Sequence, residues 1–361
     1  MYFISFSTTF IIAAILTWLV RRVALKYKIV DEPNESRKIH KSPMPLLGGL
    51  AIFLSFFAVL AYYIFFTDKI LGNEFVVKNL IGVFLGGALL MIGGFLDDKY
   101  KLAPKYQIIW PVLATAVVIV SGVGIDQITN PFGGLLHLDS WQKILFWWDG
   151  VPYKITILAD LFTFVWLMGM MYTTKFLDGL DGLVSGVSTI GAVIIFFVSL
   201  MAEVAQPGTA MLAIIFAGAC AGFLVWNFNP AKIFLGEGGS LFTGFILGAL
   251  SIIAGGKIAT TLLIMGLPIL DAAIVIIKRL ISRRSLVSAD QKHLHFRLLD
   301  AGMSQRQAVL SLYFVTLAFG TSTLFLKSGG KVFALVVLGV LGVAWTIVLI
   351  KGRRNVQKIG E

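Results

Sequence analysis

The chain has 361 residues, of which 58% are hydrophobic and only 14% are charged, and its formal net charge at pH 7 is +11. Soluble domains are about half apolar and about a quarter charged, so this composition argues against a disordered chain, a water-soluble domain and a nucleic-acid-binding module. It indicates an integral membrane protein, in which basic residues gather in cytoplasmic loops. The single cysteine, Cys220, has no partner for a disulfide within the chain.

Apolar runs long enough to cross a hydrocarbon core of ~30 Å recur along the chain. They predict an all-α integral membrane protein with eleven transmembrane helices, at residues 3–21, 46–66, 79–96, 106–123, 155–174, 183–201, 208–228, 239–256, 258–278, 307–326 and 332–350. Of the 30 Lys and Arg residues, 23 fall on one side and 7 on the other, which predicts the N-terminus outside and the C-terminus inside. The loops are short, so residues 1–361 are expected to form a single polytopic domain.

The notable loop on the predicted outer side covers roughly residues 124–154. Apolar residues alternate with polar ones around the segment Asn130-Pro131-Phe132-Gly133-Gly134, and this pattern indicates a small hairpin. Trp141, Trp147 and Trp148 follow, and we expect them to anchor the loop at the membrane interface. We interpret His137 as a surface residue.

Polar residues gather in five loops on the predicted cytoplasmic side, at about residues 24–45, 97–105, 175–182, 229–240 and 280–306. In the first loop, Arg37, Lys38 and His40 precede a point of re-entry into the membrane that is rich in proline and glycine. Such a rigid backbone lets the three basic side chains present a cationic face to a phosphate. The alternative is a solvated loop whose positive charges only set the orientation in the membrane.

Two adjacent carboxylates, Asp97 and Asp98, end the third predicted span, and Lys105 follows them. Neighbouring like charges repel, so such a pair is stabilised by a bound cation or by nearby lysines. Charges that simply mark a helix end are the alternative, but an aspartate at a helix C-terminus opposes the macrodipole. The pair therefore favours a functional site.

The third loop contains the repeat Asp178-Gly179-Leu180-Asp181-Gly182, three residues after Lys175. Two carboxylates three residues apart, each followed by glycine, let the backbone bend and let a ligand approach closely. A polar turn between two spans is the alternative, and one Asp-Gly pair would be enough for it. The repeat therefore predicts a ligand-binding turn.

The fourth loop leads into an apolar span through Phe234, Glu237 and a run of glycines. Backbone N–H groups at the start of a helix favour an anion, so this position is a candidate binding site. Glu237 is also compatible with an ordinary charge at a helix start, and Phe234 with a core position.

The fifth loop carries His293, His295 and Arg297, and Asp271 lies in the span before it. Histidines two residues apart do not share a helix face and make a poor helical metal pair, whereas a short extended stretch would place them on one side. With Arg297 beside them, phosphate recognition is the better interpretation. Asp271 is a functional candidate because carboxylates are costly inside a membrane, with pairing to a neighbouring helix as the alternative.

In this order, the five clusters resemble the polyprenyl-phosphate N-acetylhexosamine-1-phosphate transferase family, glycosyltransferase family 4, over roughly residues 20–310. The resemblance implies an eleven-span, N-out fold and a phosphoglycosyltransferase reaction. The phosphate of undecaprenyl phosphate or another polyprenyl phosphate attacks the β-phosphate of a UDP-N-acetylhexosamine at the cytoplasmic face of the bacterial inner membrane. UMP leaves, and a lipid-pyrophosphate-linked sugar that initiates cell-envelope polysaccharide synthesis is formed.

The resemblance also implies a magnesium cofactor, with manganese as a substitute, and a homodimer by analogy. Asp97 and Asp98 match the family's paired aspartates near the lipid phosphate or the metal, with Asp97 as the candidate base. Lys105 matches a phosphate-contacting lysine. The phosphate needs no strong base, because its second pKa of ~6 leaves it largely ionised at neutral pH.

Asp178 and Asp181 match the family's aspartates near the nucleotide. Phe234 corresponds to an aromatic residue that stacks on uracil, and Glu237 corresponds to a metal ligand, with Asp98 as its companion. Further matches are implied in binding the phosphates or the sugar, namely Lys38, His40, His293, His295 and Arg297. Lys175 is a candidate for the same role, although the family has another residue there.

Three positions depart from the family pattern. Lys175 stands where the family has an asparagine, Glu237 replaces an aspartate, and Phe296 replaces the third histidine of the fifth loop. A protonated lysine cannot bind a metal, whereas a glutamate, one methylene longer than an aspartate, still can. We expect Lys175 to reach Glu237, or to supply part of the positive charge at the pyrophosphate.

Within the family, the fifth loop is similar to the WecA/TagO branch rather than to MraY. UDP-GlcNAc is therefore favoured as the donor over another UDP-N-acetylhexosamine or UDP-MurNAc-pentapeptide. A membrane transporter is disfavoured because no repeat is visible and the polar residues lie on one side of the membrane. A CDP-alcohol phosphotransferase is disfavoured because Leu180 and Leu183 follow the Asp-Gly pairs. The three departures leave a non-catalytic binding relative open.

Overall fold

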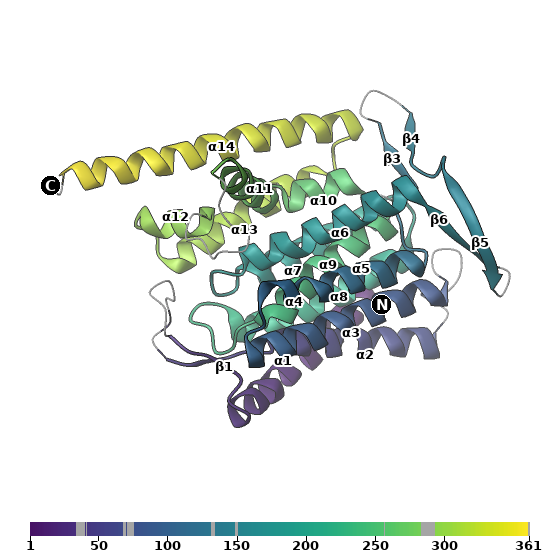
Figure 1. The fold of residues 1–361 in the computed structure, drawn as a ribbon, viewed down its shortest axis with the longest axis horizontal. Helices are drawn as coiled ribbons and strands as arrows, with labels where there is room; N and C mark the ends of the chain where they lie inside the picture. Colours follow the sequence, from purple (N-terminus) through teal and green to yellow (C-terminus); the bar gives the residue numbers. More distant parts are fainter. Residues whose placement is uncertain are drawn as a thin grey trace.

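The computed structural model describes residues 1–33, 40, 42–67, 70, 76–130, 134–148, 151–255, 257–282 and 293–359. Within these ranges the chain is a bundle of long helices with short strands at both ends (Figure 1). The helices are α1 (Tyr2–Lys26), α2 (Gly48–Phe66), α3 (Val77–Tyr100), α4 (Pro104–Gln107), α5 (Ile109–Val120), α6 (Ile157–Leu177), α7 (Leu183–Leu200), α8 (Pro207–Asn227), α9 (Gly236–Ile253), α10 (Ile258–Ile264), α11 (Gly266–Ile281), α12 (Leu294–Asp300), α13 (Gln305–Ser322) and α14 (Ser328–Ile359).

The described residues contain eight helices that are long and apolar enough to cross a membrane: α1, α2, α3, α6, α7, α8, α9 and the part of α14 from Ser328 to Leu349. The predicted all-α membrane class is therefore confirmed. Every predicted span coincides with helical structure, but three are not simple long helices. Residues 106–123 form α4 and the 12-residue α5, α13 is not among the eight, and residues 258–278 are broken. The count of eleven and the orientation stay predictions.

The break lies between α10 and α11, whose axes meet at an angle of 81°. Pro268 is in the first turn of α11, where a missing N–H costs little because that group has no intrahelical partner. A continuous helix would place the proline ring against the carbonyl of the preceding turn. The bend therefore follows from the Gly266-Leu267-Pro268 sequence, which an apolar run alone does not reveal.

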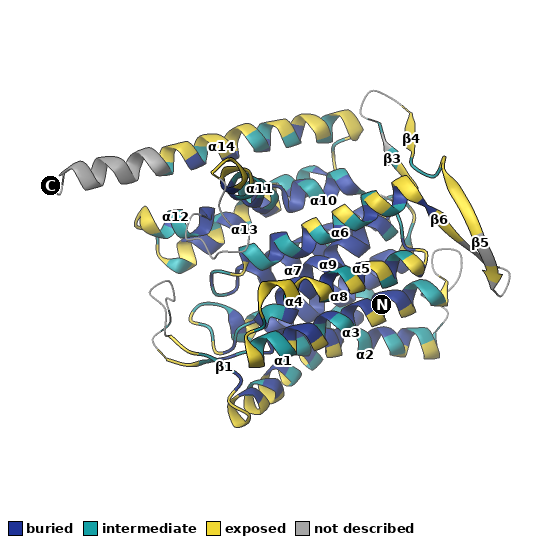
Figure 2. Ribbon diagram, in the orientation of Figure 1, coloured by how far each residue is buried: buried dark blue, intermediate teal, exposed yellow. Residues whose placement is uncertain are grey.

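The centre of the bundle is formed by α8 and α9. In their most apolar stretches, 83% and 89% of the residues are buried inside the protein. The corresponding values are 28% for α1 and 17% for α14, and Figure 2 shows exposed residues along these outer helices. Their exposed residues include large apolar side chains such as Phe3 and Phe333. An apolar periphery around satisfied helical backbones is the arrangement that a bilayer requires.

Glycines bring α2 and α3 into close contact with the start of α9. A Cβ atom on Gly49 of α2 would collide with the Cα atom of Gly239, and one on Gly94 of α3 would collide with the Cα atom of Gly238. Small residues allow helix backbones to approach closely in membranes, where van der Waals packing holds helices together. The start of α9 is therefore fixed between the start of α2 and the end of α3.

The strands form three antiparallel pairs. They are β1 (Val30–Asp31) with β2 (Met44–Pro45), β3 (Gln127–Thr129) with β4 (Leu135–His137), and β5 (Gln142–Trp148) with β6 (Val151–Thr156). The pair β3–β4 confirms the predicted hairpin, with Gln127 opposite His137. The ribbon β5–β6 was not predicted, because the aromatic run suggested interface anchors only. Both ribbons lie at the end of the bundle opposite β1 and α12 (Figure 1).

The glycine contacts predict an asymmetry between two alanine substitutions. Gly49→Ala forces a methyl group into the backbone of α9 and is expected to cost about 1–3 kcal/mol through overpacking. Gly169→Ala in α6 is the matched control, because a Cβ atom there meets nothing within 4 Å. It is expected to be neutral or to gain up to ~1 kcal/mol of helix propensity.

The buried thiol of Cys220 allows the measurement, because a thiol-reactive dye in detergent reports its exposure on heating. Gly49→Ala is expected to lower the melting temperature, and Gly169→Ala is not. Equal melting temperatures for the two variants would contradict the close packing at the start of α9.

Candidate active site

The segment 227–240 connects the first polar loop to the centre of the bundle. The backbone N–H of Phe234 donates to the carbonyl oxygen of Pro45 at 2.8 Å, and its own carbonyl accepts from the N–H of Gly48 at 3.0 Å. The next carbonyl, that of Leu235, accepts from Gly49 at 2.8 Å. The re-entry point of the first loop is therefore paired along its backbone with the residues that lead into α9.

Asp98 caps the start of α9 from the end of α3. Its Oδ1 atom accepts the backbone N–H of Glu237 at 3.0 Å. Gly236 has a positive φ of 78°, and a Cβ atom on it would collide with Oδ2 of Asp98. A carboxylate at a helix N-terminus satisfies a free N–H and complements the macrodipole. A carboxylate of the chain itself therefore caps this helix start, and the binding of a ligand anion there stays a prediction.

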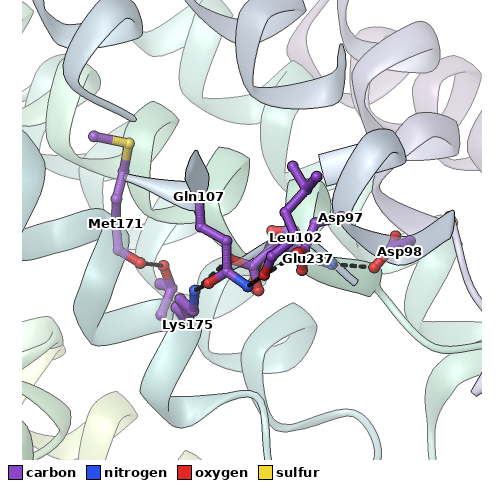
Figure 3. Close-up of polar contacts among 9 residues, drawn as sticks. Asp97, Asp98, Leu102, Gln107, Met171, Lys175 and Glu237 are labelled. Carbon is purple, nitrogen blue, oxygen red and sulfur yellow. Dashed lines mark hydrogen bonds and ion pairs between the residues drawn. The ribbon is translucent and has the colours of Figure 1, made fainter. Parts of the chain in front are cut away.

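Lys175, near the end of α6, joins two of the carboxylates (Figure 3). Its Nζ atom forms an ion pair with Oε1 of Glu237 and donates to Oε1 of Gln107 at 3.1 Å. The Nε2 atom of Gln107 in turn donates to Oδ1 of Asp97 at 2.9 Å. The expected contact of Lys175 with Glu237 is confirmed. Gln107 was not predicted, because it lies in an apolar run that was interpreted as a membrane span. A polar amide inside such a run is the signal that could have identified it.

The two aspartates of the repeat have different surroundings. Asp178 ends α6, where its N–H donates to the carbonyl oxygen of Thr174 at 3.1 Å. Desolvation, and then the neighbouring Glu237 and Asp181, raise the pKa of its carboxyl to about 7. The Oδ2 atom of Asp181 accepts from Nδ2 of Asn229 at 2.9 Å and from the N–H of Ala231 at 3.0 Å. Asp181 therefore holds the turn after α8, whereas Asp178 is desolvated and lies among other carboxylates, which keeps its pKa raised.

Asn227 is a second residue that sequence reasoning did not single out. Its Oδ1 atom accepts from the N–H of Gly182 at 3.1 Å and from the hydroxyl of Ser185 at 2.9 Å. Its Nδ2 atom donates to the carbonyl of Ile233 at 3.0 Å. The buried amide thus fixes the Asp-Gly turn against the segment that carries Phe234.

The fifth loop is anchored on the bent helix α11. Asp271 faces Nδ1 of His293 at 2.9 Å and accepts the N–H of Leu294 at 2.9 Å. His293 is the N-cap of α12, and its extended backbone (φ −67°, ψ 151°) places its ring parallel to that of His295, with centroids 5.7 Å apart. The local extended stretch explains how histidines two residues apart share one side.

His295 lies against the Asp-Gly repeat. A Cβ atom on Gly179 would collide with its Nε2 atom, which makes glycine necessary at that position. Burial, and secondarily the neighbouring His293, lower the pKa of His295 to about 3, so the ring is neutral at physiological pH. Within the described residues, Nε2 of His295 and Nη1 of Arg297 are buried without a hydrogen-bond partner. Such atoms are costly unless a ligand satisfies them.

The remaining predicted residues divide into three groups. His40 joins the site, because its ring packs edge-on against Phe234 with centroids 5.2 Å apart. Lys105 is exposed, and its ammonium lies over the ring of Tyr106, 5.0 Å from the centroid. Lys38 lies outside the described residues, as do Arg37 and the part of the fifth loop from 283 to 292.

The predicted magnesium site can be compared with the carboxylates as they stand. In the described ranges, no three His, Cys, Asp or Glu side chains are grouped so that they could hold a metal ion. Oε1 of Glu237 faces the ammonium of Lys175, and Oδ1 of Asp98 accepts an N–H. Magnesium requires near-octahedral oxygen ligands, so this arrangement does not fit a resident ion. Glu237 and Asp98 as metal ligands stay a prediction.

Comparison with known proteins places this geometry in a family. The model of glycosyl transferase family 4 matches residues 80–255. A probable undecaprenyl-phosphate N-acetylglucosaminyl 1-phosphate transferase of Bacillus subtilis is 31% identical over 90% of this chain and 85% of its own length. The chain belongs to glycosyl transferase family 4.

Two further relatives indicate the range of the family. A decaprenyl-phosphate N-acetylglucosaminephosphotransferase of Mycobacterium tuberculosis is 32% identical over 94% of this chain and 87% of its own length. A phospho-N-acetylmuramoyl-pentapeptide-transferase of Pelotomaculum thermopropionicum is 29% identical over 89% of this chain and 95% of its own length. The resemblance drawn from the five clusters is therefore confirmed.

The capping role of Asp98 in this family 4 chain is testable by stability. Asp98→Ala removes the acceptor for the N–H of Glu237 in the first turn of α9 and is expected to cost ~1 kcal/mol, up to about 2. Asp98→Asn keeps an oxygen acceptor and is expected to keep most of the stability. The melting temperature from dye labelling of Cys220 compares the two.

Asp97→Ala is the matched control, because Asp97 accepts from Gln107 and not from the start of a helix. It is expected to lower the melting temperature less than Asp98→Ala. An Asp98→Asn variant as unstable as Asp98→Ala would argue against the capping role.

Proposed function

We propose that this enzyme transfers GlcNAc-1-phosphate from UDP-GlcNAc to a polyprenyl phosphate, releases UMP and leaves a lipid-pyrophosphate-linked sugar. The observation that carries the proposal is the convergence of the polar clusters on the start of α9, in a chain whose relatives are named for this transfer. Carboxylates, a lysine, histidines and an arginine at one end of a membrane bundle suit phosphoryl transfer, which relies on positioning and charge neutralisation.

The nucleotide is proposed to bind at the first and fourth loops. Phe234 offers a ring to the uracil, and His40 supports that ring from the side. The turn that Asp181 fixes borders the same segment, and Asp178 is proposed to lie near the nucleotide. The unpartnered Nε2 of His295 and Nη1 of Arg297 are polar groups that the pyrophosphate or the sugar would satisfy.

The lipid phosphate is proposed to approach Asp97 at the end of α3. A phosphate with a second pKa of ~6 is largely ionised at neutral pH, so Asp97 has to orient it and accept at most one proton. The exposed Lys105 is placed to attract the phosphate from the membrane surface. The bond between the β-phosphorus and UMP breaks as the lipid oxygen attacks, and UMP carries away the negative charge.

The membrane orientation belongs to the same proposal. The 23 to 7 distribution of Lys and Arg supports a cytoplasmic position for the five loops and insertion in the bacterial inner membrane. A homodimer, and the initiation of a cell-envelope polysaccharide, follow from the family resemblance and stay predictions.

Turnover by the purified protein tests the proposal. With undecaprenyl phosphate, UDP-GlcNAc and MgCl₂ in detergent, we expect UMP and a lipid-pyrophosphate-GlcNAc detected by mass spectrometry. A panel with other UDP-N-acetylhexosamines and UDP-MurNAc-pentapeptide is the control for the donor. UMP from another donor only would change the sugar and keep the reaction. Nucleotide binding without UMP from any donor would make the chain a non-catalytic relative.

The uracil platform predicts a kinetic signature at Phe234. Stacking of a base on an aromatic ring is worth ~1–3 kcal/mol, so Phe234→Ala is expected to raise KM for UDP-GlcNAc about tenfold. Phe234→Tyr keeps the ring and is the matched control, with KM expected close to that of the unchanged protein. A fall in kcat with KM unchanged in Phe234→Ala would place the nucleotide elsewhere.

A further inference from the structure

Lys175 is the cation that the structure places on Glu237. Its side chain is 22% exposed and that of Glu237 is 16% exposed, so the pair is largely withdrawn from solvent at the meeting point of α6 and α9. Ion pairs that are shielded from water are screened little by salt. Removal of one partner leaves the other as an uncompensated charge.

The ammonium is held from two directions. Glu237 faces it on one side, and the amide oxygen of Gln107 accepts from it at 3.1 Å on the other. The amide nitrogen of Gln107 is engaged in turn by Asp97 at 2.9 Å. An ammonium has three donors, and this arrangement uses two of them. The ring of Tyr172 lies 5.7 Å from the same ammonium. Its position is therefore set by Gln107 of α4 and Glu237 of α9, and Asp97 of α3 holds Gln107 in place.

The surrounding charge explains why a cation belongs there. The carboxylates of Asp97 and Glu237 are connected through Gln107 and Lys175. Asp98 caps the helix start in which Glu237 lies. Carboxylates gathered at one site repel one another unless a positive charge lies between them. In the family pattern that charge comes with a divalent ion, and a lysine replaces an asparagine at this position of the chain.

We propose that the ammonium of Lys175 is the resident cation of this site, held on Glu237 where a divalent ion would bind, so that a divalent ion binds there only by displacing it. Lys175 thereby contributes positive charge beside the pyrophosphate without coordinating it. This inference deepens the proposed function. Its consequence for turnover depends on the proposed function, whereas the position of the ammonium does not. Gln107 acts as a positioning residue, because it keeps the ammonium against Glu237.

Direct binding of Mn²⁺ tests the displacement without any substrate. The purified chain is titrated with Mn²⁺ alone in detergent, and free Mn²⁺ is followed by its electron paramagnetic resonance signal. Lys175→Asn is expected to bind Mn²⁺ at least about tenfold more tightly than the unchanged protein, because a competing unit charge is removed at contact distance. Equal or weaker binding by Lys175→Asn would overturn the proposal.

Two further variants keep this test decisive. Lys99→Asn removes one positive charge at the end of α3, where Lys99 lies over aromatic rings, and it is expected to leave the Mn²⁺ affinity unchanged. Lys175→Met gives a second neutral side chain of similar length in case the asparagine variant does not fold. Adding Glu237→Gln to Lys175→Asn is expected to abolish the gained affinity, and a retained gain would mean that the ion binds elsewhere.

The consequence for turnover is measured separately. In EDTA-treated buffer the unchanged protein is expected to retain measurable UMP release that Lys175→Asn loses, and added Mg²⁺ is expected to restore the variant. Complete loss in both proteins would overturn the catalytic part of the inference. UMP release by neither protein, even with Mg²⁺, would count against the proposed function, whereas the Mn²⁺ result would still decide the inference on Lys175.

Discussion

The close contact of three backbones at the start of α9 is the constraint on which the rest of the structure depends. Gly49, Gly94 and the pair Gly238–Gly239 let the backbones touch directly at this junction. The start of α2 and the end of α3 can then lie against the start of α9, and Asp98 can cap it by accepting the N–H of Glu237. Without that approach, the aspartates of α3 and the lysine of α6 would not share one site.

Much of this arrangement could be predicted from the sequence, because charges and glycines in an apolar chain stand out. The membrane class and the hairpin β3–β4 follow from composition and turn residues. The Lys175–Glu237 contact was expected because both residues depart from the family pattern in the same region. The expectation that the five clusters form one site depended on their order in the chain, which resembles the family pattern. No residue within a single loop indicates which other loop it contacts. These contacts depend on how the helices pack, which composition does not encode.

The residues that sequence reasoning missed share a physical reason. Gln107 and Asn227 are neutral amides within apolar runs, and their importance lies in connecting other groups rather than in any charge of their own. The 81° bend before Pro268 was hidden in the same way, because a window average treats a broken helix as a continuous one. Polar positions inside predicted spans therefore merit the same attention as charged loops.

The ribbon β5–β6 has a practical consequence, because it lies at the end of the bundle opposite the polar clusters (Figure 1). Compact helical membrane proteins offer few rigid features outside the detergent micelle for aligning particle images. A binding fragment raised against this ribbon would supply such a feature while leaving the loops around α9 free. Nucleotide-bound and lipid-bound states could then be imaged with the same fragment attached.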